Sequence, residues 1–221
     1  MPQPLSRITN GQRIGYENSL PFDNPMICAA ALQIISSWSN LDSQVIGTFG
    51  VMFPESIEIL ANRYIQYSAQ SPKKSMIDAL AIAGLNEREL DVFEKLLRKK
   101  EAVYKLRNPI AHWVLGHSDS YPELLIATDA KEYIRFDAKW RSVTNKMSAG
   151  EGTPSDLDEA LLRLLNSSQA YDLEELNRIS GQIADTAKLF VEFNFLLGVR
   201  IRDNDRKWHA EKFARLSQML G

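Results

Sequence analysis

Apolar residues recur at three- and four-residue steps through most of this chain, which is the spacing that places them on one face of an α-helix. Four segments of this kind open with an N-cap residue or an early proline, at Asn24, Pro54, Ser71 and Asn86. The last also has Glu89 three residues after Asn86, the spacing of a capping box. It predicts a long helix over residues 87–106.

The pattern changes after that helix. Short runs rich in aliphatic and aromatic residues lie at 114–115, 123–128 and 132–137, and turn-forming residues separate the last two runs. This arrangement predicts a small antiparallel hairpin. Residues 148–156 have the composition of a loop. Helical spacing resumes from Leu157 to Leu165 and again from Leu173 to about Ile201, and a last helix after Asp203 carries Leu220.

These elements together predict a mainly all-α fold, a helical bundle of about six or seven helices with a small inserted β-hairpin near residues 113–140. No linker long enough to separate two cores is visible. We therefore expect residues 1–24 to form an N-terminal arm and residues 25–221 to form one helical domain.

Composition and charge narrow the class of protein. Hydrophobic residues make up 44% and charged residues 24% of the 221 residues, both close to globular averages. No secretory signal is visible, and no apolar run approaches the roughly 20 residues that a bilayer requires. We therefore expect a cytoplasmic protein without a membrane partner. The net charge of −2 gives no overall attraction to nucleic acid, so RNA binding would need a local basic patch.

Common cofactor and metal motifs are absent from the sequence. It has no glycine-rich loop followed by Lys-Ser/Thr, no Cys-x-x-Cys and no His-Glu-x-x-His. One cysteine and three histidines, His112, His117 and His209, are too few to favour a structural zinc site. The expected chemistry therefore uses no metal and no cofactor.

One short stretch stands apart, Arg107-Asn108-Pro109-Ile110-Ala111-His112. It resembles the R-x(4–6)-H motif of the HEPN superfamily, whose members are helical and usually dimeric. The resemblance implies a metal-independent endoribonuclease of the kind found in toxin–antitoxin pairs and antiviral defence. It also implies that Arg107 and His112 are the catalytic pair and Asn108 the accompanying polar residue. The implied partners are RNA, a second copy of the chain and an antitoxin-like protein.

A second match to this motif occurs from Arg202 to His209, with six residues between them instead of four. The surroundings favour the first occurrence, because the densest run of basic residues precedes it and aromatic residues flank it. Positive charge beside rings that can stack on bases is typical of RNA recognition. The residues expected to contact RNA are Lys99, Lys100, Tyr104, Lys105 and Trp113.

The geometry of the motif allows two arrangements. On a straight helix Arg107 and His112 point about 140° apart, so they would not face one site. Pro109 disfavours helical backbone at Asn108, which predicts a break near residues 107–108, with Asn108 capping a short helix that carries His112. Alternatively, the site is shared across a two-fold axis. Lys100 and Arg107 both fall within an apolar stripe, which indicates an interface or a cleft.

Three functions remain open from the sequence. The first is RNA cleavage, in which histidine exchanges protons near neutral pH and arginine holds the phosphate. The second is a non-catalytic module that binds RNA, a nucleotide or a protein. The third is a structural or regulatory helical protein in which the motif is coincidental.

Overall fold

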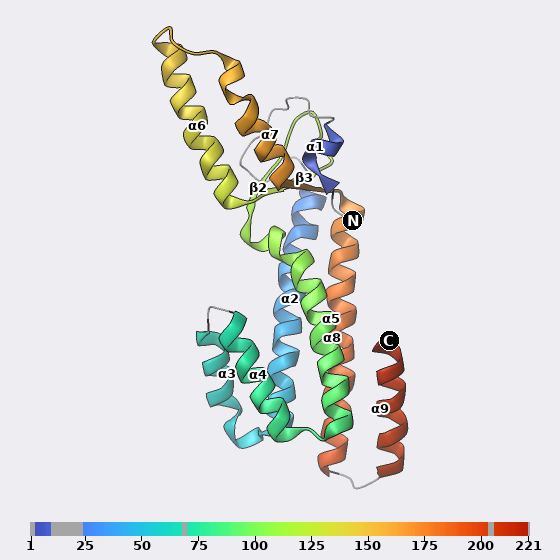
Figure 1. Cartoon of the computed structure of the whole chain (residues 1–221). Helices are drawn as coiled ribbons and strands as arrows, with labels where there is room; N and C mark the ends of the chain where they lie inside the picture. The colour runs from blue at the N-terminus through green and yellow to red at the C-terminus, as the bar shows by residue number, and fades with distance from the viewer. Residues whose placement is uncertain (1–2, 10–23, 68–69, 203–205, 221) are drawn as a thin grey trace. The chain divides into compact units, whose positions relative to one another are not determined.

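The computed structural model describes residues 3–9, 24–67, 70–202 and 206–220 (Figure 1). Within them the chain is mainly α-helical with one small antiparallel sheet, which confirms the predicted fold class. The residue contacts divide the chain into two compact units. We call residues 1–35 and 105–180 the sheet unit, and residues 36–104 and 181–221 the helical unit. The single domain expected over residues 25–221 stays a prediction.

Nine α-helices lie in the described part of the chain, more than the six or seven predicted. Their bounds are α1 Leu5–Ile8, α2 Pro25–Met52, α3 Ile57–Gln66, α4 Gln70–Gly84, α5 Glu87–His112, α6 Ala130–Ser148, α7 Asp158–Ser167, α8 Leu173–Arg202 and α9 Arg206–Leu220. Short 3-10 turns, Pro54–Ser56 and Pro154–Leu157, precede α3 and α7. Residues of α2, α5 and α8 belong to both units.

The predicted capping box at the start of α5 is confirmed. The backbone N–H of Glu89 donates to Oδ1 of Asn86 at 3.1 Å, and the backbone N–H of Asn86 donates to Oε2 of Glu89 at 3.0 Å. Each side chain thus provides an acceptor for a backbone group that the first helical turn leaves without one. This local sequence signal positions the start of α5.

The sheet belongs to the sheet unit and has the strand order β1-β4-β3-β2, with every neighbouring pair antiparallel. Its strands are β1 Gln3–Pro4, β2 Val114–Gly116, β3 Leu125–Thr128 and β4 Ser168–Tyr171. The outer strand β1 therefore lies in the segment expected to be an N-terminal arm, next to a strand from far along the chain.

The predicted pairing of residues 123–128 with residues 132–137 is wrong. The strand β3 pairs instead with β2, and residues 130–148 form the helix α6. The physical reason is a cap at Asp129, whose carboxylate accepts from the backbone N–H groups of Lys131 at 2.9 Å and Glu132 at 3.3 Å. Such a cap supplies partners for the first amides of a helix, and a strand would not use it.

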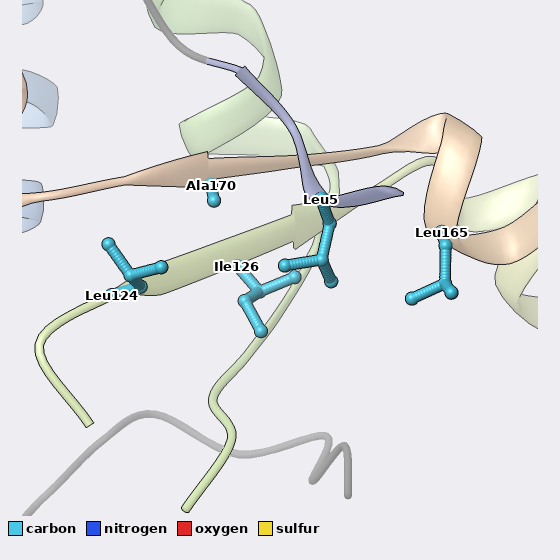
Figure 2. Close-up of a cluster of buried hydrophobic side chains, with 5 residues drawn as sticks. All are labelled: Leu5, Leu124, Ile126, Leu165 and Ala170. Carbon is cyan, nitrogen blue, oxygen red and sulfur yellow. The ribbon is translucent and has the colours of Figure 1, made fainter. Parts of the chain in front are cut away.

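The core of the sheet unit forms on one face of the sheet. Figure 2 shows its buried side chains. They come from α1, α7, β3, β4 and the loop before β3: Leu5, Leu124, Ile126, Leu165 and Ala170. Beside it, the hydroxyl groups of Thr128 and Ser168 are hydrogen-bonded at 2.8 Å between β3 and β4, so that these buried polar groups have partners. The core therefore depends on residues from both ends of the unit.

The core of the helical unit is built from aromatic rings. Phe93 of α5 stacks on Phe193 of α8 with ring centroids 5.6 Å apart, and its edge meets Phe190 at 6.1 Å. Phe213 of α9 meets Phe193 at 5.7 Å. Phe93, Phe190 and Phe193 are fully buried, and such ring pairs add to the free energy gained by burying their surface.

We expect Asp129→Ala to lower the free energy of unfolding by about 1 kcal/mol, because the first amides of α6 lose their acceptor. Unfolding in guanidinium chloride measures the change. Asp119→Ala, which removes an exposed carboxylate from a loop, is the matched control. Equal midpoints for the two variants would show that the cap contributes nothing.

Candidate functional site

The arginine–histidine motif lies at the C-terminal end of α5, in the sheet unit. The predicted break at residues 107–108 is wrong, because α5 continues through Pro109 to His112. Beyond it, the backbone N–H of Trp113 still donates to the carbonyl of Pro109 at 3.0 Å. Pro109 and Ile110 are both buried, so packing holds a turn in which proline itself supplies no donor.

The side chains of Arg107 and His112 meet within one chain. Nη1 of Arg107 lies 2.9 Å from Nε2 of His112. A guanidinium has no acceptor, so the arginine donates and Nε2 of the imidazole accepts. Although the two residues are five apart in the helix, the long arginine side chain closes the gap. The pair needs no second copy of the chain to form.

Exposure differs between the two members of this pair. His112 is exposed to solvent, whereas Arg107 is half-buried. The imidazole is therefore open to solvent, and the guanidinium is partly covered by the protein. A fixed positive group beside an accessible proton acceptor is an arrangement that can bind an anion and move a proton next to it.

Three more of the predicted site residues lie in the same short stretch of the sheet unit. Lys105 is exposed two positions before Arg107, and Asn108 is half-buried next to it. Trp113 is half-buried directly after the helix. Lys105, Asn108 and Trp113 are thus near the arginine–histidine pair in sequence, within two residues of one of its members.

Lys100 belongs to the helical unit, and its charge is already engaged there. Its ammonium lies 2.9 Å from Oδ1 of Asp42 and 4.6 Å from the ring centroid of Trp38, and only 11% of the side chain is exposed. Asp42 also accepts from the hydroxyl of Tyr64 at 3.2 Å. The apolar stripe that contains Lys100 therefore holds an internal ion pair.

Tyr104 and Lys99 are also part of the helical unit. The Tyr104 ring packs against Trp38 with centroids 5.5 Å apart, so it serves the interior of this unit. Lys99 is half-buried. Of the residues predicted to contact RNA, those after residue 104 lie beside the motif, and Lys100 and Tyr104 have packing roles.

Asp42 is the residue that reasoning from the sequence missed. Burial, together with the charge of Asp42, raises the pKa of the Tyr64 hydroxyl, so this hydroxyl stays protonated and donates to the carboxylate. A lysine in an apolar stripe does indicate a buried counter-ion. Nothing in the local pattern of α5 says which carboxylate on another helix supplies it.

The remaining histidines are less informative. His117 is half-buried just after β2. The second arginine–histidine spacing, Arg202 to His209, lies outside the residues whose side chains are described.

No family model, no curated protein and no solved structure matches this chain. Within the described ranges, no helix is both long and apolar enough to cross a membrane. The same part of the chain contains no group of three or more His, Cys, Asp or Glu side chains arranged to hold a metal ion. The candidate site consequently stands on its own geometry.

Proposed function

We propose that this chain is a metal-independent endoribonuclease of the HEPN type, with Arg107 and His112 as its catalytic residues. The observation that carries the proposal is the 2.9 Å contact between Nη1 of Arg107 and Nε2 of His112. It brings together the two groups that the chemistry needs, a proton acceptor and a fork of donors for phosphate.

In the proposed reaction, Nε2 of His112 accepts the proton of a ribose 2′-hydroxyl. The 2′ oxygen attacks the adjacent phosphorus and the bond from phosphorus to the 5′ oxygen breaks. The products are a 2′,3′-cyclic phosphate and a 5′-hydroxyl, whose oxygen takes its proton from water. The guanidinium of Arg107 stabilises the negative charge that grows on the phosphate oxygens.

The contact between Arg107 and His112 affects the order of RNA binding and proton transfer. Arg107 donates to the same nitrogen that must accept the proton, so that nitrogen is occupied before RNA binds. A phosphate forms shorter and stronger hydrogen bonds with a guanidinium than a neutral imidazole does. RNA binding therefore draws Arg107 onto the phosphate and frees Nε2 of His112 for proton transfer.

The neighbouring residues suit the binding of a single strand. Lys105 is exposed and provides a positive charge for the RNA backbone, and Trp113 provides a ring on which a base can stack. The amide of Asn108 can hydrogen-bond to ribose or phosphate. A homodimer would place two such sites in one particle, and an antitoxin-like partner would act by covering them.

The test is cleavage of single-stranded RNA by the purified protein with EDTA present. We expect products that end in a 2′,3′-cyclic phosphate and a 5′-hydroxyl. His112→Ala should reduce the rate at least about 100-fold, the usual range for loss of a general base, while His117→Ala keeps it. RNA binding without cleavage by the unaltered protein would favour a binding module. Cleavage by His112→Ala at the unaltered rate would exclude the proposed chemistry.

A further inference from the structure

A pocket of about 840 Å³ lies in the helical unit, lined by residues of α3, α4 and α5. This volume falls in the range of sites that bind small molecules. All of its lining residues belong to the helical unit, whereas Arg107 and His112 belong to the sheet unit. The pocket is therefore separate from the candidate site for RNA cleavage.

One end of this pocket is apolar. Ile77, Ala81 and Phe93 are buried beneath it, and Leu90 and Leu97 are half-buried in its wall. Ala81 and Leu90 lie toward the turn that connects α4 to α5, and Ile77 and Leu97 lie farther from it along the same helices. The exposed parts of Leu90 and Leu97 offer a ligand hydrocarbon surface.

The other end is polar. Lys73 lies in the early part of α4, about 12 Å from Ala81 at roughly 1.5 Å per residue. On α5, Glu101 lies about 16 Å beyond Leu90 by the same rise. The two helices follow one another through a short turn, so their polar ends lie at the same side of the pocket. The pocket is consequently amphipathic along its length.

Most of the lining cations already have a partner. Lys74 pairs with Asp78 at 2.6 Å, and Lys100 pairs with Asp42 at 2.9 Å. The Nη1 atom of Arg98 lies 3.8 Å from a carboxylate oxygen of Glu94. In each pair a carboxylate offsets the positive charge, so these three cations attract an anionic ligand less strongly.

Lys73 differs from these cations. It is half-buried, with its ammonium 4.6 Å from the ring centroid of Tyr64, and among the described residues no carboxylate lies within ion-pair distance of it. Glu101, the carboxylate at the same end, is exposed, so water solvates its charge. Lys73 is thus the lining residue whose positive charge an anionic ligand can neutralise.

We propose that this pocket binds a small amphipathic anion, with its apolar body along the wall formed by the half-buried Leu90 and Leu97 and its anionic head group at Lys73. The head group supplies the anionic partner that the ammonium lacks among the described residues, and the body removes the exposed parts of Leu90 and Leu97 from water. This site is independent of the proposed RNA cleavage and can exist whether or not the chain cuts RNA.

The test uses the fluorescent probe 8-anilinonaphthalene-1-sulfonate, which has an aromatic body and one sulfonate. We expect saturable binding by the intact chain and displacement by decanoate, with decylamine at least about tenfold weaker because its charge has the opposite sign. Displacement by decylamine at the same concentration as decanoate, or an absence of saturable binding, would overturn the proposal.

Two variants locate the binding in the pocket. Lys73→Gln should weaken decanoate about tenfold by removing the head-group contact, while Lys188→Gln, a change of an exposed lysine on α8, should leave it unchanged. Leu97→Trp should abolish displacement by filling the apolar end, with circular dichroism confirming the fold. Unchanged affinity for decanoate in Lys73→Gln contradicts the proposal even if Leu97→Trp does not fold.

Discussion

Arg107→Lys is expected to reduce RNA cleavage at least about 100-fold without loss of the fold. Lysine keeps the positive charge but loses the planar fork that can hold two phosphate oxygens at once. It also cannot reproduce the geometry of the 2.9 Å contact with His112. Initial cleavage rates at saturating RNA, with EDTA present, measure the effect.

Arg163→Lys is the matched control for this variant. Arg163 is exposed on α7 of the same unit and pairs with an exposed glutamate, so its replacement by lysine should not change cleavage. Cleavage by Arg107→Lys at the rate of this control would show that the guanidinium has no part in the reaction.

Mixing two inactive variants extends the same test. Arg107 and His112 meet within one chain, so a mixture of Arg107→Lys and His112→Ala chains contains no intact pair. We expect no recovery of cleavage after the two variants are unfolded and refolded together. Recovery would mean that the active pair forms between two chains.

The largest expected effect on stability is at Asp42. Asp42→Ala should lower the free energy of unfolding by about 3 kcal/mol, because the ammonium of Lys100 then stays inside the helical unit without its counter-ion. The hydroxyl of Tyr64 loses its acceptor as well. Guanidinium chloride unfolding of the two proteins gives the difference.

A second substitution separates the charge effect from simple loss of packing. In Asp42→Ala with Lys100→Met, no charge remains to be buried, so most of the lost stability should return. Asp185→Ala removes an exposed carboxylate and should change the free energy of unfolding by less than about 0.5 kcal/mol. If Asp42→Ala were no more destabilising than Asp185→Ala, the ion pair would not stabilise the unit.

Local signals explain which parts of the fold could be predicted. The start of α5 depends on Asn86 and Glu89, three residues apart, and both hydrogen bonds of that cap are present. Tyr133, Ile134 and Phe136 favoured a strand by composition, yet the carboxylate of Asp129 starts a helix there. The β propensity of residues 132–137 indicated a strand, but the N-cap at Asp129 favours a helix and determines the structure here.

The parts of the fold that could not be predicted depend on contacts between segments far apart in the sequence. The strand β1 is two residues long and pairs with β4 near the other end of the sheet unit, so no local pattern indicates it. Likewise, the candidate pair Arg107 and His112 was visible in the sequence, but the continuous helix around Pro109 was not. Burial of Pro109 and Ile110 depends on the surrounding unit, which a short motif does not describe.

The pairing of β1 with β4 also bears on how the protein folds as it is synthesised. Gln3 is translated 167 residues before its partner Ala170. The adjacent strands β2 and β3 can pair much sooner, because only a short loop separates them. Until translation reaches residues 168–171, Leu5 lacks part of its core and the edge of β3 lacks a neighbour. A nascent chain in this state exposes an unpaired edge to which chaperones or other chains can bind.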